Sequence, residues 1–286
     1  MKKKNWISLL LIVLCLGILL GYRELDRIRT DSKAPVIAVE EKLLELSTLE
    51  PRSALLQGVT ATDDRDGDVT DSLVVESVRL LRDDGTVTVS YAAFDRAGNV
   101  AKVQREVRYA DYVRPRFSLS QPLVFMQRNY ELLEIVSAQD LLDGDISHWI
   151  RATALDDAEV GYGGTYNVLF QVTNSLGDMV ELVLPVEIYT PGIQEARLTL
   201  TDYLVYVEAG DSFNARSYPE CFVIGKTEIS LRGGVPEELR LTVTGNVDTG
   251  VPGIYEVQYR ISYTPNRDQP DQVYTAYSKL FVVVEG

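Results

Sequence analysis

The chain has 286 residues, of which 45% are hydrophobic and 24% charged, and this composition excludes both a disordered tail and a membrane-embedded bundle. After Lys4 it carries 25 basic and 42 acidic side chains, a net charge of −17 that repels phosphate and excludes nucleic acid as a partner. Its two cysteines, Cys15 and Cys221, lie too far apart to pair, which excludes a disulfide scaffold and a cysteine-rich metal site.

The N-terminal residues predict a signal-anchor helix over residues 1–22, followed by a juxtamembrane linker over residues 23–33. Lys2, Lys3 and Lys4 precede an uncharged run of 18 residues, 5–22, which as a helix would be about 27 Å long. No small-x-small cleavage site ends this run, which favours retention. The lysines favour a single-pass protein of the cell membrane, with the C-terminal portion outside the cytoplasm.

Two stretches of the chain repeat one pattern at a period close to 80 residues. The segment from Asp31 to Pro35 returns from Asp111 to Pro115, and the Asp-Gly-Asp of residues 66–68 returns at residues 143–145. A strand beginning at Gly85 and its turn, Asp95-x-x-Gly98, return from Gly164 to Gly177. Alternating apolar residues in these strands predict a buried face, and each copy is expected to end in a hairpin.

The last third of the chain reads as a divergent third copy. Residues 252–261 match the Gly164 strand, residues 274–284 supply the returning strand, and the connection over residues 263–272 is long and polar. The predicted fold is all-β, with three tandem immunoglobulin-like β-sandwiches after one transmembrane helix. The predicted domains span residues 34–110, 111–190 and 191–286, with one short helical turn near residues 53–56.

The motifs resemble bacterial immunoglobulin-like repeat domains of the hyalin-repeat and pesticidal crystal toxin type. The resemblance rests on a Pro-led entry strand, the loop Ala61-x-Asp63-x-x-Asp66-Gly-Asp-Val-Thr70, and the turn from Asp95 to Asn99. In the second copy Asn174 and Asp178 replace the Asp and Asn of that turn, and the third copy retains only the Gly-x-Tyr strand. Such a resemblance implies surface-exposed repeat modules in adhesins or spacers.

The acidic loop of the first copy is the predicted metal site. Its carboxylates supply the hard oxygen ligands that calcium prefers, although the spacing does not match an EF-hand. The alternative is that these side chains cap turns and accept hydrogen bonds from backbone amides. The candidate calcium ligands are Asp64, Asp66, Asp68, Asp71 and Asp95.

The inventory of catalytic residues is thin, which favours a protein that is not an enzyme and needs no cofactor. His148 is the single histidine, so any catalytic triad or His-based zinc site would have to include it. The glycines of residues 161–164 precede a predicted strand rather than a helix, which favours a turn over a phosphate cradle. We therefore predict that the chain has no catalytic residues.

The function expected from these patterns is that of a non-catalytic, membrane-anchored adhesion, scaffold or spacer module in the cell envelope. Its partners would be an envelope protein or polysaccharide, with the membrane contacted through the N-terminal helix. The third domain, as the most divergent, is expected to lie at the tip and to recognise the partner. The alternative is a carbohydrate-binding module for wall or extracellular polysaccharide, with exposed Tyr and Trp stacking on sugars.

Overall fold

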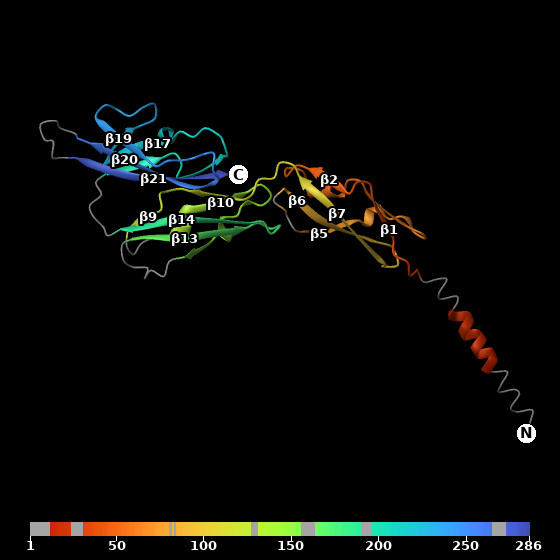
Figure 1. Ribbon diagram of the computed structural model, residues 1–286. Coiled ribbons are helices and arrows are strands. Elements are labelled where there is room, and N and C mark those ends of the chain that lie inside the picture. Colours follow the sequence, from red (N-terminus) through yellow and green to blue (C-terminus); the bar gives the residue numbers. More distant parts are fainter. Residues whose placement is uncertain are drawn as a thin grey trace, which may run out of the picture. The chain divides into compact units, whose positions relative to one another are not determined.

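Three successive segments of the chain fold into the same pair of antiparallel-rich sheets (Figure 1). The computed structural model describes residues 12–23, 31–79, 82, 84–126, 131–155, 164–189, 196–264 and 273–286. In each segment one sheet has three strands and the other has four, and the same relative positions along the chain form each sheet. The prediction of three β-sandwiches is therefore confirmed at the level of architecture.

The first sandwich packs the sheet β1-β3-β4 against the sheet β2-β7-β6-β5. The predicted helical turn near residue 53 is the 3-10 helix η1. The elements are β1 (Val36–Val39), β2 (Leu43–Leu46), η1 (Arg52–Leu56), β3 (Val59–Asp63), β4 (Gly67–Asp68), η2 (Thr70–Ser72), β5 (Val74–Arg79), β6 (Thr86–Phe94) and β7 (Val100–Tyr109).

The second sandwich repeats this order with the sheets β11-β10-β8 and β12-β13-β14-β9. A single-turn α-helix replaces η1. The elements are β8 (Arg116–Leu119), β9 (Val124–Met126), α2 (Leu132–Ile135), β10 (Val136–Asp140), β11 (Gly144–Asp145), η3 (Ser147–Trp149), β12 (Arg151–Ala154), β13 (Gly164–Thr173) and β14 (Met179–Tyr189).

The third sandwich has the sheets β15-β17-β18 and β16-β21-β20-β19, so it keeps the frame although its sequence has diverged. The long connection predicted over residues 263–272 lies mostly outside the described residues. The elements are β15 (Ala196–Leu200), β16 (Leu204–Glu208), η4 (Ala215–Ser217), β17 (Pro219–Ile224), β18 (Thr227–Ser230), β19 (Leu239–Thr244), β20 (Gly253–Tyr263) and β21 (Tyr274–Glu285).

A long antiparallel hairpin ends each sandwich, as the alternating pattern predicts. In the first hairpin the side chains of Val87, Val89 and Tyr91 are fully buried, because alternate residues of β6 face the opposing sheet. The corresponding hairpins are β13–β14 and β20–β21. In every sandwich a short strand then pairs in parallel with the second hairpin strand, as β2 does with β7.

The described residues fall into two compact units, Met1–Tyr112 and Val113–Gly286. The second unit holds both the second and the third sandwich, whose buried side chains form one continuous hydrophobic cluster that includes Phe117, Phe170 and Phe281. Strand β8 of the second sandwich contacts β16 of the third. The third sandwich therefore packs on the second instead of forming the tip of a row.

The predicted transmembrane helix and single-pass localisation are wrong. Residues 12–23 are helical. Among the described residues no helix is long and apolar enough to cross a membrane. The predicted membrane contact through the N-terminal segment stays a prediction.

A buried tyrosine ties the hairpin to the preceding 3-10 helix in two of the sandwiches. In the first, the Tyr91 hydroxyl donates to the Leu55 carbonyl of η1 over 2.6 Å. In the third, the Tyr259 hydroxyl donates to the Ala215 carbonyl of η4 over 2.7 Å. The second sandwich has Phe170 at the equivalent place, which is fully buried. The buried guanidinium of Arg105 donates to the Tyr91 hydroxyl, so this hydroxyl serves two partners.

We predict that Tyr91→Phe and Tyr259→Phe each destabilise the chain by about 1–3 kcal/mol, because the buried Arg105 guanidinium then loses an acceptor in the first variant and the Ala215 carbonyl loses its donor in the second. Urea unfolding of each variant measures the change. The matched control is Tyr255→Phe, which removes a hydroxyl whose bond to the Val251 carbonyl is exposed. Equal losses in all three variants would contradict the proposed tether.

Candidate functional site

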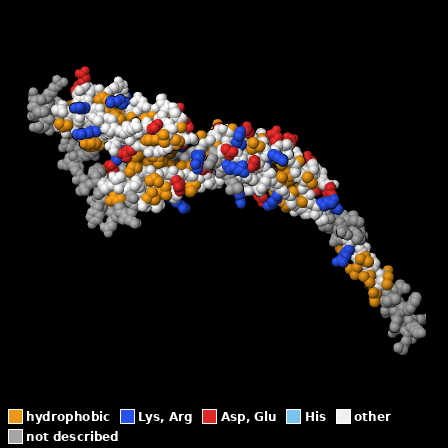
Figure 2. Space-filling view, viewed as in Figure 1, with side chains coloured by type: hydrophobic (Ala, Val, Ile, Leu, Met, Phe, Trp, Pro, Cys, Tyr) orange, Lys and Arg blue, Asp and Glu red, His pale blue; other side chains and the backbone are white. Residues whose placement is uncertain are grey.

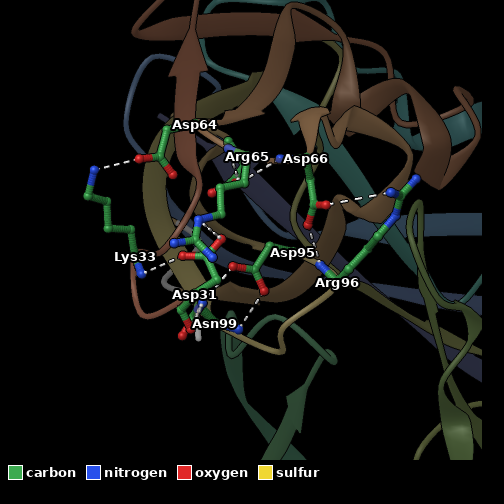
Figure 3. Close-up of polar contacts among 9 residues, drawn as sticks. Asp31, Lys33, Asp64, Arg65, Asp66, Asp95, Arg96 and Asn99 are labelled. Atoms are coloured by element: carbon green, nitrogen blue, oxygen red, sulfur yellow. Dashed lines mark hydrogen bonds and ion pairs between the residues drawn. The ribbon is translucent and has the colours of Figure 1, made fainter. Parts of the chain in front are cut away.

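Three carboxylates from distant parts of the sequence meet at one end of the first sandwich. Asp31 lies in the segment before β1, Asp63 is the last residue of β3, and Asp95 directly follows β6. One carboxylate oxygen from each lies within 4.8 Å of the other two. Figure 3 shows the side chains of Asp31 and Asp95 close to one another, with the side chain of Arg65 beside Asp31.

Asp63 is the most constrained member of the group, with only 8% of its surface exposed. Its Oδ1 accepts hydrogen bonds from the backbone amides of Asp66 and Arg65, at 2.9 and 2.8 Å. These bonds hold the pKa of the Asp63 carboxyl below its ordinary value, the Asp66 amide contributing most. Asp63 Oδ2 is buried and has no hydrogen-bond partner among the described residues.

The other two carboxylates are held in place by short hydrogen bonds. Asp95 accepts from the Asn99 backbone amide at 2.7 Å and from the Asn99 side-chain amide at 2.6 Å. That side-chain amide also donates to the backbone carbonyl of Asp31, and the Lys33 amide donates to Asp31 Oδ1. Arg65 Nε lies 3.8 Å from Asp31 Oδ2. The site therefore assembles three fixed carboxylates beside a single guanidinium.

Glycines with positive φ shape the acidic turns, as the Asp-Gly-Asp motif requires. Gly67 and Gly144 have φ angles of 74° and 71°, a conformation that side-chain-bearing residues rarely adopt. Each lets the chain reverse directly after the strand that carries Asp63 or Asp140, so that these carboxylates accept from the amides of their own turn.

Of the five predicted calcium ligands, the structure brings only Asp95 into the group. Asp64 pairs with Lys33 at 2.5 Å, and Asp66 accepts from the Arg96 backbone amide at 2.8 Å (Figure 3). Asp68 accepts from the Thr70 amide, and Asp71 is exposed in η2. Asp64, Asp66 and Asp68 thus have the turn-capping and pairing roles that the alternative interpretation predicts, and calcium binding itself stays a prediction.

The sequence pattern placed weight on the acidic loop, which contains Asp63, and missed Asp31, which lies outside that loop. Asp31 lies 32 residues before Asp63, so loop composition gives no indication that the two meet. The signal was present in the repeat, since Asp31 begins the same entry segment that Asp111 begins in the second copy.

The second sandwich builds the equivalent corner from different chemistry. Asp140 occupies the place of Asp63, and its Oδ1 likewise accepts two backbone amides. Asn174 replaces Asp95, and its side-chain amide donates to Asp140 Oδ2 over 3.2 Å. Arg114 forms a two-pronged ion pair with Asp178, the nearest contact being 2.6 Å. Every charge at this corner therefore has a protein partner.

Asp111, which corresponds to Asp31 in the second copy, makes contacts different from those of Asp31. Asp111 accepts from the Ser47 hydroxyl at 2.6 Å and from the Thr48 amide at 2.7 Å. These bonds lower the pKa of the Asp111 carboxyl, the Ser47 hydroxyl contributing most. Asp111 therefore fastens the end of the first sandwich to the loop after β2.

Comparison with known proteins gives distant structural likenesses only. No family model matches the chain, and no curated protein matches it. One similar structure holds the CBM51-2 domain in complex with GlcNAc and the INT domains of Clostridium perfringens ZmpB, at 17% identity and a TM-score of 0.23, covering 58% of this chain and 31% of that one. The extracellular domain of protocadherin gammaB4 is similar at 12% identity and a TM-score of 0.18, covering 89% and 50%.

A third similar structure is the lipoprotein BT2262 from Bacteroides thetaiotaomicron, at 11% identity and a TM-score of 0.22, covering 58% of this chain and 98% of that one. The chain spans less than two thirds of the first two proteins. Scores this low carry no argument, so the tandem immunoglobulin-like architecture rests on the strand order of the three sandwiches themselves. The finer likeness to hyalin repeats or crystal toxin modules stays a prediction.

We predict that Asp145→Asn lowers stability at neutral pH and flattens the acid dependence of stability. Hydrogen bonds from Ser147, the hydroxyl first and then the amide, lower the pKa of the Asp145 carboxyl. A lowered folded-state pKa contributes stability above the unfolded value of about 3.9 and loses it as the pH falls further. Urea unfolding between about pH 7 and pH 2 measures this, with exposed Asp71→Asn as control. Parallel pH curves for natural chain and Asp145→Asn would contradict it.

Proposed function

We propose that this chain is a non-catalytic binding and spacing module, in which a rigid pair of sandwiches presents a surface to a protein partner. The observation that carries the proposal is the continuous hydrophobic cluster shared by the second and third sandwiches. An apolar interface of this kind resists the hinge motion that is the default between tandem domains. A rigid pair holds a bound partner at a set distance and orientation.

Polar contacts surround this interface and support the same proposal. Arg116 of β8 pairs with Glu285 and lies 3.6 Å from Glu208, and its guanidinium lies 5.0 Å from the centre of the Tyr206 ring. The Tyr206 hydroxyl accepts from the Phe117 amide at 2.9 Å. Burial raises the pKa of the Tyr206 phenol to about 12, so it stays a neutral partner.

A second ion cluster joins the two sandwiches. Lys279 of β21 reaches Glu187 of β14 at 2.5 Å and Glu256 of β20 at 3.2 Å, with 15% of its side chain exposed. Partly buried pairs of this kind are screened less by salt than exposed ones. Together with Arg116, Lys279 favours one position of the third sandwich against the second.

The surface chemistry fits a binding role better than a catalytic one. The His148 ring lies tilted beside the Trp149 ring in the helix η3, with their centres 4.9 Å apart, and both residues are exposed. On the face shown in Figure 2, basic and acidic side chains are interspersed rather than gathered by sign. Such a surface suits contact with a protein and supports the predicted exclusion of nucleic acid.

We predict a narrow distribution of distances between spin labels on Thr153 of β12 and Glu228 of β18, measured by pulsed electron resonance. Cys15 and Cys221 are replaced by Ala so that only the two introduced cysteines are labelled. Arg116→Ala together with Lys279→Ala should broaden the distribution, because both ion clusters are lost. Arg240→Ala, on exposed β19, is the control and should leave it narrow. A broad distance distribution in the labelled chain that retains Arg116 and Lys279 would overturn the rigid-spacer proposal.

A carbohydrate-binding module is the second candidate function, and Trp149 favours it. Its side chain is 41% exposed beside His148, which offers an aromatic face on which a sugar ring could stack. Tyr277 is more exposed, at 60%, but the guanidinium of Arg260 already lies 5.7 Å from the centre of its ring. Trp149 is therefore the better platform.

We predict, for this second function, that Trp149→Ala weakens retention on wall polysaccharide by about tenfold, equivalent to about 1.4 kcal/mol. Affinity electrophoresis in gels containing each polysaccharide measures retention. Tyr277→Ala serves as the control and should be retained like the natural chain. If no polysaccharide retards the natural chain while a protein fraction binds it, the carbohydrate function is excluded.

A further inference from the structure

We propose that Asp31, Asp63 and Asp95 bind one calcium ion, which fastens the segment entering the first sandwich to two of its turns. The site differs from the acidic loop expected from the sequence, because Asp64, Asp66 and Asp68 already have partners within the protein. It stands independently of the proposed spacing function.

The spacing of the three oxygens fits a calcium ion. Calcium lies about 2.3–2.6 Å from its oxygen ligands, so two oxygens that share one ion lie at most about 5 Å apart. The three carboxylate oxygens lie within 4.8 Å of one another.

A buried oxygen without a partner points to a ligand at this place. Asp63 is more than nine-tenths buried, and Asp63 Oδ2 has no hydrogen-bond partner among the described residues. A buried carboxylate oxygen left unpaired is costly, and such atoms are rare in folded proteins. In the second sandwich the corresponding oxygen, Asp140 Oδ2, accepts from Asn174 Nδ2. In the first sandwich the residue at the place of Asn174 is Asp95, whose carboxylate cannot donate such a hydrogen bond.

The equivalent corner of the second sandwich can be compared with this site, because protein groups occupy the positions at which we propose a cation in the first. There the amide of Asn174 and the guanidinium of Arg114 neutralise the corner. In the first sandwich Ala34 stands at the place of Arg114, and Asp95 at the place of Asn174. The first corner therefore has one carboxylate more than the second, and at these two places it lacks the amide and the guanidinium of the second, although the Asn99 side-chain amide donates to Asp95.

Arg65 does not supply the missing cation. Its Nε is 3.8 Å from Asp31 Oδ2, and 44% of its side chain is exposed. One guanidinium at that distance leaves three carboxylates incompletely balanced, and an exposed arginine can turn outward when an ion binds.

The three ligands come from three separate segments of the first sandwich. Asp31 precedes β1, Asp63 ends β3, and Asp95 opens the turn between β6 and β7. An ion shared by them would fix the direction in which the chain enters the sandwich. Calcium would therefore control how firmly whatever precedes residue 31 is attached.

The test is titration of the full chain with calcium chloride alone, followed by calorimetry. We expect one site per chain, lost in Asp31→Asn and in Asp95→Asn and retained in Asp64→Asn. The melting midpoint of the first sandwich should rise by about 4–8 °C when calcium is present at several times its dissociation constant. Retention of binding in Asp31→Asn, or its loss in Asp64→Asn, would overturn the proposed ligand set.

The Asp95→Asn variant carries a second readout that a merely structural role would not produce. Its new amide can donate to Asp63 Oδ2, as Asn174 donates to Asp140, so without calcium the variant should melt no lower than the natural chain. With calcium, the natural chain should melt at a higher temperature than the Asp95→Asn variant. A variant that melts lower in the absence of calcium would contradict the assignment, and Asp31→Asn tests the ligand set if Asp95→Asn fails to fold.

Discussion

The long hairpin that ends each sandwich is the constraint on which the other features depend. Because strand side chains alternate in direction, burying Val87, Val89 and Tyr91 fixes the register of β6 against β7 and leaves no freedom to slip by one residue. The turn residue Asp95 is then held at one end of the sheet. The same register carries the Tyr91 hydroxyl to the carbonyl of η1. The position of Asp95 and the hydrogen bond of the Tyr91 hydroxyl thus both follow from the alternating apolar pattern of β6.

The three sandwiches show how far side chains can change while this frame persists. Tyr91 and Tyr259 keep the hydroxyl tether, whereas Phe170 fills the same place by packing alone. At the acidic corner, the first sandwich gathers carboxylates and the second pairs Arg114 with Asp178. Each change exchanges one way of satisfying a buried group for another, because an unsatisfied group at either position would be costly.

The local parts of this structure could be predicted from sequence, because period-two alternation and Gly-containing turns act over a few residues. The hairpins and the turn at Gly67 follow from such signals. The packing of the third sandwich on the second could not, since Arg116 and Glu285 are 169 positions apart and neither lies in a distinctive motif. The membership of Asp31 in the acidic corner was missed for the same reason. The single-pass prediction was wrong because an apolar run does not by itself specify a helix long and apolar enough to cross a membrane, and none is found among the described residues.

The two compact units differ in how their parts are held, and this difference bears on function. The pair formed by the second and third sandwiches is joined by an apolar cluster with ion pairs at its edge, so its stiffness is built into the chain. The entry to the first sandwich depends instead on carboxylates whose mutual repulsion opposes assembly unless a positive charge intervenes. In the proposed binding and spacing module, the second unit would keep its surface fixed, while the entry segment of the first sandwich would respond to calcium.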